Sequence, residues 1–184
     1  MFMLKLGSFS RGRNNASTAF SATVLASAPL TKTKRKMKLI PIKEHPHENK
    51  EFLSNPDCKD SINMTIDFYK KIGFVPPWIG YYANINNQLV GAAAFKGKPK
   101  NGKVEIAYGT FPQFQQQGVA TEICQQLIKL ALKTDPSVTI TARTLPEENY
   151  SVRLLRKNNF ELLGTVIDDE DGPVWEWEWK GNGK

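Results

Sequence analysis

Cysteine and histidine are scarce in this sequence. It contains only Cys58 and Cys124, and their separation matches no metal-binding or redox motif, so a disulfide framework is not indicated. Cys124 falls on the apolar stripe of a predicted helix, which favours a small buried hydrophobe over a catalytic thiol. His45 and His47 flank a proline without further ligands at metal-binding spacing, so no metal is expected.

Long hydrophobic runs are also missing. None approaches the roughly 20 apolar residues that a helix needs to cross a bilayer, so neither a transmembrane segment nor a membrane partner is predicted. The chain has 184 residues and a hydrophobic fraction of 40%. These values are ordinary for a single globular domain with a sizeable core.

Acidic residues are absent from the start of the chain. The formal charge is +7, but residues 1–38 carry eight basic side chains and no acid, whereas residues 39–184 carry 17 basic and 18 acidic ones. A nucleic-acid partner is therefore not expected, because a basic patch would have to lie on the folded part. A protein that binds nucleic acid through its basic leader, residues 1–36, remains a separate hypothesis.

The composition of residues 1–36, rich in Ser, Thr, Ala and basic residues, predicts a flexible leader. Two interpretations are open. As an organelle transit peptide it would direct the protein to an organelle, and as a non-native upstream extension it would leave a cytoplasmic protein. A domain is expected over residues 37–180.

Hydrophobic periodicity predicts a single α/β domain with a mixed sheet and the order βαβββαβαββ. The first helix is expected to be capped by Asp60 or Ser61 and to end at Gly73, and the first hairpin is expected to turn at Asn86-Asn87. The expected strands cover residues 38–42, the two arms of a hairpin within 78–97, 103–111, 137–143, 160–166 and 174–179. The expected helices cover residues 60–74, about 117–133 and about 148–158.

The last strand alternates tryptophan with glutamate. Trp175, Trp177 and Trp179 share one face, and Glu176 and Glu178 lie on the other. A tryptophan row could stack on nucleobases. The acidic opposite face and the lack of a basic groove favour packing into the core instead.

The junction between strand 103–111 and the helix that follows holds three glutamines and a glycine. A helix N-terminus leaves about four backbone N–H groups without partners, and with the helix dipole these form an anion site suited to a pyrophosphate. Gly118 has no Cβ and Ala120 is small, so an anion could approach the backbone closely, and Thr121 adds a hydroxyl. The alternative is a simple strand-to-helix turn.

The motif Gln115-x-x-Gly118-x-Ala120 resembles the Gln/Arg-x-x-Gly-x-Gly/Ala signature of the GNAT N-acetyltransferases, in which this loop and helix start hold the pyrophosphate of acetyl-CoA. The blocks "EIAYGTFP" before it and "TLPEENYSVRLLRKNNFELLG" and "DGPVWEWEW" after it agree in order and spacing. The second block resembles the RimJ/RimL ribosomal-protein acetyltransferases. The resemblance covers about residues 37–180.

The resemblance implies the GNAT acyl-CoA N-acyltransferase fold, with central strands that splay around a β-bulge, and acetyl-CoA as co-substrate without a metal. The backbone N–H groups near Thr110 and Phe111 would stabilise an oxyanion or bind the pantetheine arm. Asn149 would approach the same arm, serve as a helix N-cap, or do both. The residues implied in binding acetyl-CoA are Thr110, Phe111, Gln115, Gln116, Gln117, Gly118, Val119, Ala120, Thr121 and Asn149.

Two residues are candidates for the chemistry. Glu105 shares a strand face with Ala107 and Gly109, which leave room for substrate or water, and family members place a general base at this point. The alternative is a solvated glutamate. Many family members carry a tyrosine that acts as general acid where this sequence has Leu155, so no acid is carried over to that position. Tyr150, at a different position in the first turn of the same helix, is the catalytic candidate. The alternative is that no dedicated acid is needed, because a CoA thiol is already a fair leaving group.

The residues and the resemblance together predict an N-acetyltransferase. It would transfer acetyl from acetyl-CoA to a primary amine, either a protein N-terminus or a small amine, by direct attack in a ternary complex. A monomer or a homodimer is expected. The alternative is a catalytically inactive acyl-CoA-binding module, which Leu155 favours.

Overall fold

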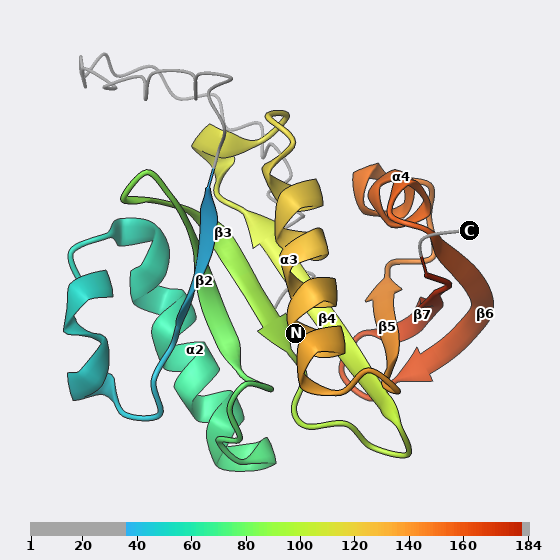
Figure 1. Ribbon diagram of the computed structural model, residues 1–184, viewed down its shortest axis with the longest axis horizontal. Coiled ribbons are helices and arrows are strands. Elements are labelled where there is room, and N and C mark those ends of the chain that lie inside the picture. Colours follow the sequence, from blue (N-terminus) through green and yellow to red (C-terminus); the bar gives the residue numbers. More distant parts are fainter. Residues whose placement is uncertain (1–35, 182–184) are drawn as a thin grey trace, which may run out of the picture.

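A computed structural model describes residues 36–181, so the predicted leader lies outside the described residues except for Lys36. Seven strands form one sheet in the order β1-β2-β3-β4-β5-β7-β6 (Figure 1). The strands are β1 (Met37–Pro41), β2 (Gly80–Ile85), β3 (Gln88–Phe95), β4 (Lys103–Thr110), β5 (Thr139–Thr144), β6 (Phe160–Asp168) and β7 (Gly172–Trp179). The helices are α2 (Pro56–Ile72), α3 (Val119–Thr134) and α4 (Tyr150–Lys157), with short 3-10 helices η1 (Pro46–Phe52) and η2 (Pro112–Phe114). The predicted order of strands and α-helices is confirmed.

The start of α2 differs from the prediction. The helix begins at Pro56, and the side chain of Asn55 caps it by accepting a hydrogen bond from the backbone N–H of Asp57 at 2.9 Å. Asn followed by Pro at the first helical position is itself a helix-start signal, but it precedes the apolar periodicity that located the helix. The cap predicted at Asp60 or Ser61 is therefore wrong, and the predicted end at Gly73 is confirmed.

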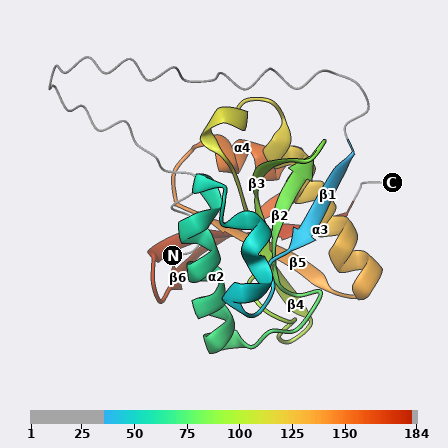
Figure 2. The same ribbon diagram turned by 90° about the vertical axis from the view of Figure 1, so that its left-hand side faces the viewer.

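Helices α2 and α3 lie on opposite faces of the first strands of the sheet (Figure 2). Two hydrogen bonds hold helix α2 against β2. The hydroxyls of Ser61 and Tyr82 lie 2.6 Å apart, and the Tyr69 hydroxyl accepts the backbone N–H of Gly80 at 2.9 Å. Helix α3 packs its apolar stripe against β3 and β4. The core thus fills both sides of the antiparallel half.

Strands β4 and β5 are paired over only part of their length. Their parallel pairing runs from Lys103 opposite Thr139 to Ile106 opposite Ala142, whereas β4 remains paired with β3 as far as Thr110. The predicted splay of the central strands is confirmed. The expected β-bulge is not at this place, since the β3–β4 register is unbroken.

The tryptophan row belongs to the core. Trp177 is 1% exposed, and its indole N–H donates to the Thr144 hydroxyl at 3.0 Å. Trp175 and Trp179 are partly buried and pack against the same cluster. The preference for core packing over base stacking is confirmed. Among the described residues, no helix is both long and apolar enough to traverse a bilayer.

Candidate active site

A cavity of about 440 Å³ opens where β4 and β5 separate. It is lined by β4, by the end of β5, by the junction of η2 with α3 and by the first turn of α4. The structure brings most of the predicted site residues to this cavity. Those that line it are Glu105, Thr110, Gln115, Gln116, Val119, Ala120, Asn149 and Tyr150. Four others do not line it: Phe111, Gln117, Gly118 and Thr121.

The cavity passes through the sheet. Side chains of a strand alternate between its two faces, and neighbouring residues of β4 from both faces line the cavity. Tyr108 lies on the α3 side, against Cys124, whereas Glu105 lies on the opposite side. The cavity is therefore a channel with one end at the start of α3 and the other at Glu105, and we refer to it below as the channel.

The first turn of α3 has unpaired backbone donors. Its N-cap, Gly118, has φ +78°, and the first backbone bond that closes the helix runs from Glu122 N–H to the Gly118 carbonyl at 3.2 Å. The N–H groups of Val119, Ala120 and Thr121 meet no acceptor among residues 36–181. Three unpaired donors at the positive end of a helix dipole are the arrangement that binds anions.

Open space lies beside these donors. A Cβ added to Gly118 would have no neighbour within 4 Å. Gln116 also has a left-handed backbone, with φ +60°. The Gln117 side chain is engaged within the junction, where its amide N–H donates to the Gln113 carbonyl at 3.1 Å. The junction thus leaves the N-terminus of α3 (called the helix mouth below) uncovered, while side chains of the junction stabilise the turn.

Thr110 and Phe111, predicted together, differ in the structure. The Thr110 hydroxyl oxygen is buried at the channel and has no hydrogen-bond partner. A buried polar atom without a partner is costly, so a ligand that pairs with it would be favoured. Phe111 is 2% exposed, and its N–H donates to the Val90 carbonyl at 3.0 Å. The prediction of Phe111 N–H as an oxyanion donor is wrong, because the contact with β3 extends one residue beyond β4.

The start of α4 borders the channel from the other side. Asn149 is the N-cap, and its side-chain oxygen accepts the backbone N–H of Val152 at 3.1 Å while the residue also lines the channel. Tyr150 is 50% exposed at the channel, whereas Leu155 is buried. The predicted cap is confirmed, and contact of Asn149 with the co-substrate stays a prediction.

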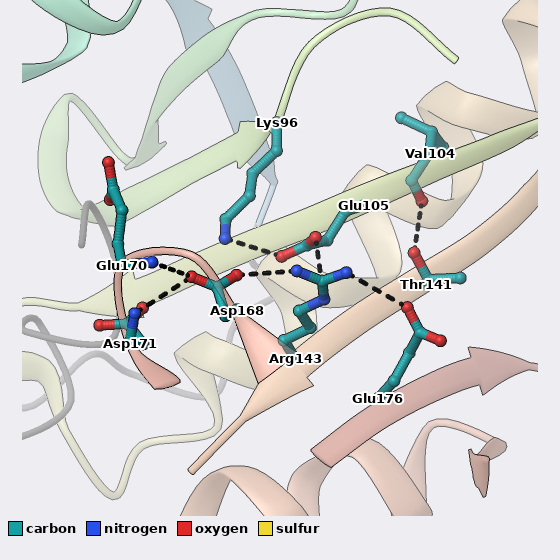
Figure 3. Close-up of polar contacts among 9 residues, drawn as sticks. All are labelled: Lys96, Val104, Glu105, Thr141, Arg143, Asp168, Glu170, Asp171 and Glu176. Carbon is teal, nitrogen blue, oxygen red and sulfur yellow. Dashed lines mark hydrogen bonds and ion pairs between the residues drawn. The ribbon is translucent and has the colours of Figure 1, made fainter. Parts of the chain in front are cut away.

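Charged side chains gather at the Glu105 end of the channel (Figure 3). The Glu105 carboxylate lies 2.9 Å from the Lys96 ammonium and 3.5 Å from Nε of Arg143. Its side chain is 17% exposed, so the alternative of a freely solvated glutamate is wrong. Sequence reasoning did not select Lys96 or Arg143. The alternation of β5 could have placed Arg143 on the Glu105 face, but Lys96 follows a strand and has no such signal.

Arg143 also contacts Asp168 at 2.7 Å. Partial burial opposes ionisation of Asp168, but bonds from the Glu170 N–H, the Arg143 guanidinium and the Asp171 N–H outweigh it and lower the pKa of Asp168 to about 2. The described residues contain no group of three or more His, Cys, Asp or Glu side chains arranged to hold a metal ion.

Cys124 has no reactive character. Burial raises the pKa of its thiol to about 12, although a hydrogen bond with Tyr108 acts in the opposite direction. Burial likewise raises the pKa of Cys58 to about 11. A protonated thiol is a poor nucleophile. The prediction that Cys124 is a small buried hydrophobe is confirmed.

A sheet that splays between two parallel strands, with an uncovered helix N-terminus at the gap, is the arrangement expected from the resemblance to acyl-CoA-dependent transferases. The family model described as "Acetyltransferase (GNAT) domain" matches residues 29–161. The chain belongs to the GNAT acetyltransferase family.

One curated relative is similar over part of its sequence. It is the "Uncharacterized N-acetyltransferase YjdG" of Bacillus subtilis strain 168, which is 35% identical over 93 residues. These residues are 50% of this chain and 52% of the relative, so the similar segment spans about half the length of that protein.

Solved structures share the fold. The RimL ribosomal L7/L12 alpha-N-protein acetyltransferase superposes with a TM-score of 0.58 at 18% identity, over 82% of this chain and 94% of that one. The aminoglycoside acetyltransferase AAC(6')-Ib in complex with coenzyme A superposes with a TM-score of 0.56 at 19% identity, over 78% and 94% of the two chains. These superpositions establish a common fold, and at such low sequence identity they establish the fold alone.

Proposed function

We propose that this protein transfers the acetyl group of acetyl-CoA to a primary amine by direct attack in a ternary complex. The observation that carries the proposal is the channel, which joins the unpaired N–H groups of α3 to Glu105 across the sheet. A ligand that is anionic at one end and reactive at the other would reach both faces through it. Acetyl-CoA is such a ligand and supplies the activated thioester.

The channel and the adjoining N-terminus of α3 fit the parts of acetyl-CoA. The N–H groups of Val119, Ala120 and Thr121 would hold its pyrophosphate. The edge of β4 from Ala107 to Thr110, unpaired with β5, would bond the amides of the pantetheine arm as a neighbouring strand does. The buried Thr110 hydroxyl would gain the partner that it lacks within the protein.

Glu105 would act as general base. An amine attacks a thioester only when it is neutral, so a proton must leave nitrogen before or during attack. Glu105 lies at the end of the channel opposite the helix mouth and would receive this proton directly or through one water molecule. Its carboxylate lies within ion-pair distance of Lys96 and Arg143.

A second proton must reach the departing sulfur. Tyr150 lines the channel with an exposed phenol and is the proposed donor. Leu155, at the position where many family members carry a tyrosine, has no proton to give. The proton count then closes, since Glu105 takes one proton from the amine and the thiolate receives one from Tyr150 or from water.

Two classes of acceptor are proposed. RimL is named as an alpha-N-protein acetyltransferase, which suggests the N-terminal amine of a protein. AAC(6')-Ib is named as an aminoglycoside acetyltransferase, which suggests a small polar amine. A screen of acetyl-CoA turnover, with release of free CoA thiol as readout, over N-terminal peptides and small amines tests both.

The first prediction concerns Glu105→Gln. Removal of the base is expected to lower kcat/KM by roughly 10²- to 10⁴-fold, the usual contribution of general base catalysis, and to leave CoA affinity nearly unchanged. The matched control is Glu161→Gln on the exposed side of β6, which is expected to retain full activity. Equal activity of the Glu105 variant and wild type would exclude Glu105 as the base.

The alternative, an inactive acyl-CoA-binding module, rests on Leu155. The same screen separates it from the transferase. A module would bind CoA, measured by calorimetry, and release no thiol above the hydrolysis background with any amine. A transferase releases thiol in proportion to the acetylated product, which mass spectrometry identifies.

A further inference from the structure

Arg143 lies immediately beyond the point where β4 and β5 cease to pair. The last pair of these strands is Ile106 with Ala142, and Arg143 is the next residue of β5. In the pairing of β5 with β7 it stands opposite Glu176. Because Glu105 stands opposite Thr141, Glu105 and Arg143 project from the same face of the sheet.

One guanidinium reaches carboxylates from three strands (Figure 3). Its Nε lies 3.5 Å from Glu105, Nη1 lies 2.7 Å from Asp168, and Nη2 lies 3.5 Å from Glu176. A planar guanidinium presents its donors in a fixed fork, which a lysine ammonium cannot reproduce. Arg143 therefore joins β4 to the β6–β7 hairpin by side-chain contacts where backbone pairing has ended.

The partner of Arg143 on the hairpin is itself held firmly. While one carboxylate oxygen of Asp168 accepts from Arg143, the other accepts the backbone N–H groups of Glu170 at 3.0 Å and Asp171 at 3.2 Å. Asp171 in the same turn lines the channel. The guanidinium is thus anchored on a structured turn at the border of the channel.

The contacts of Arg143 with Glu105 and Glu176, both at 3.5 Å, are looser than its contact with Asp168. The buried Nε of Arg143 has no hydrogen-bond partner, although a Glu105 oxygen lies 3.5 Å away. Catalytic hydrogen bonds that are long in the absence of substrate commonly tighten when the substrate is bound. An unused donor directed at the candidate base is therefore available for that step.

We propose that Arg143 is the positioning residue of Glu105, and that it fixes the carboxylate at the end of the channel across the gap between β4 and β5. The inference rests on the proposed function, because Glu105 acts as a general base only if the protein is a transferase. It adds a residue that lines the channel and acts through Glu105.

The charges around Glu105 determine the sign of the pH effect. Lys96, after β3, and Arg143, on β5, are the cations that contact it, and the nearby acids are Asp168 of β6, Asp171 of the turn and Glu176 of β7. Lys103 and Glu178, which lie on the same face, pair with each other at 3.9 Å. Loss of the Arg143 charge leaves Lys96 to offset the acids. The ionised base is then less favoured. The acid limb of the activity profile is expected to move to higher pH.

The second prediction compares Arg143→Gln with Arg143→Lys in the full-length chain. Arg143→Gln is expected to lower kcat by about 10- to 100-fold, the cost of misplacing a catalytic group by roughly 1 Å, and to shift the acid limb upward. Arg143→Lys retains the charge but not the fork, so kcat falls and the limb stays. CoA affinity is expected to change less than about threefold in both variants, since α3 is untouched.

Arg156→Lys is the matched control. Arg156 lies on α4, outside the channel, and two of its guanidinium nitrogens donate to Glu148 at 2.9 and 2.7 Å. The Arg156→Lys variant should therefore keep the wild-type pH profile. Wild-type kcat and profile in a folded Arg143→Gln, or in Arg143→Lys if the first variant does not fold, overturns the inference alone. A wild-type protein without turnover on any amine overturns the proposed function instead, and the inference with it.

Discussion

At the residue scale, Asp168 shows how a single carboxylate can stabilise the protein without touching the substrate. Its folded pKa of about 2 lies below the ordinary value of 3.8. A carboxyl whose pKa is lowered by folding contributes stability above its unfolded pKa and loses that contribution as the pH falls through the folded one. The Asp168 contribution is therefore present above about pH 4, declines as the pH falls from there, and is lost below about pH 2.

The third prediction follows from this dependence. Asp168→Asn is expected to lower the free energy of unfolding by about 1 kcal/mol at pH 7, a value reduced for solvent screening. The difference from wild type should shrink as urea unfolding is repeated at decreasing pH towards 3. A difference that is constant from pH 7 to pH 3 would show that the lost hydrogen bonds matter and the charge does not.

At the element scale, two glycines with similar backbone conformations, one at the start of α3 and one in a distant loop, allow backbone strain to be distinguished from ligand binding. Gly118 has φ +78°, a conformation that costs an alanine about 1 kcal/mol. Gly102 in the β3–β4 loop has φ +73°, and an added Cβ at either position would meet nothing within 4 Å. An alanine would therefore be strained to the same extent at either position, but only Gly118 adjoins the unpaired N–H groups.

The fourth prediction uses this pair. Gly118→Ala and Gly102→Ala are both expected to lower the free energy of unfolding by about 1 kcal/mol. Only Gly118→Ala should weaken CoA binding, by at least about tenfold, because its methyl group occupies the space beside the anion site. Equal CoA affinities of the two variants, measured by calorimetry, would place the pyrophosphate elsewhere.

At the scale of the whole molecule, the sheet consists of two parts with few backbone links. Strands β1–β4 form an antiparallel part and β5–β7 another, and these parts pair only from Lys103 to Ile106 on β4. A ligand in the channel would contact both parts. Bound CoA should therefore stabilise the domain as a unit.

The fifth prediction is a rise in the melting temperature. CoA at 100 times its Kd is expected to add about 2.7 kcal/mol, which for a chain of this length corresponds to roughly 5–10 °C. Adenosine 3′,5′-bisphosphate, which has neither the pantetheine arm nor the pyrophosphate, should give a smaller shift at the same concentration. The channel would be excluded as the binding site if the two ligands gave equal shifts.

Local patterns in the sequence predicted most of the elements. The alternation of β4, the apolar stripe of α3 and the Asn86-Asn87 turn each arise from neighbours a few residues apart, and both asparagines have the positive φ that such a turn requires. The missed start of α2 has the same local origin. The Asn55 cap lies seven residues before Ile62, the first apolar residue used to locate that helix.

The site was predicted in part for a different reason. Glu105 and the Gln115–Ala120 junction were predicted because alternation and helix starts are local features and because both resemble the GNAT pattern. The Arg143 contacts with Asp168 and Glu176 join residues 25 and 33 positions apart, and Lys96 meets Glu105 through a loop. Neither separation has a sequence period, so these contacts became visible only in three dimensions.

The amino-acid sequence by itself determined the order of strands and helices, the place where α3 starts and the face on which Glu105 stands, because each depends on backbone geometry within a few residues. The tertiary structure alone decided that β4 and β5 separate at Ile106 in particular, that the Phe111 N–H donates to the Val90 carbonyl, and that Arg143 reaches three carboxylates. These features depend on how distant segments pack together, and packing between distant segments leaves no periodic mark on the chain.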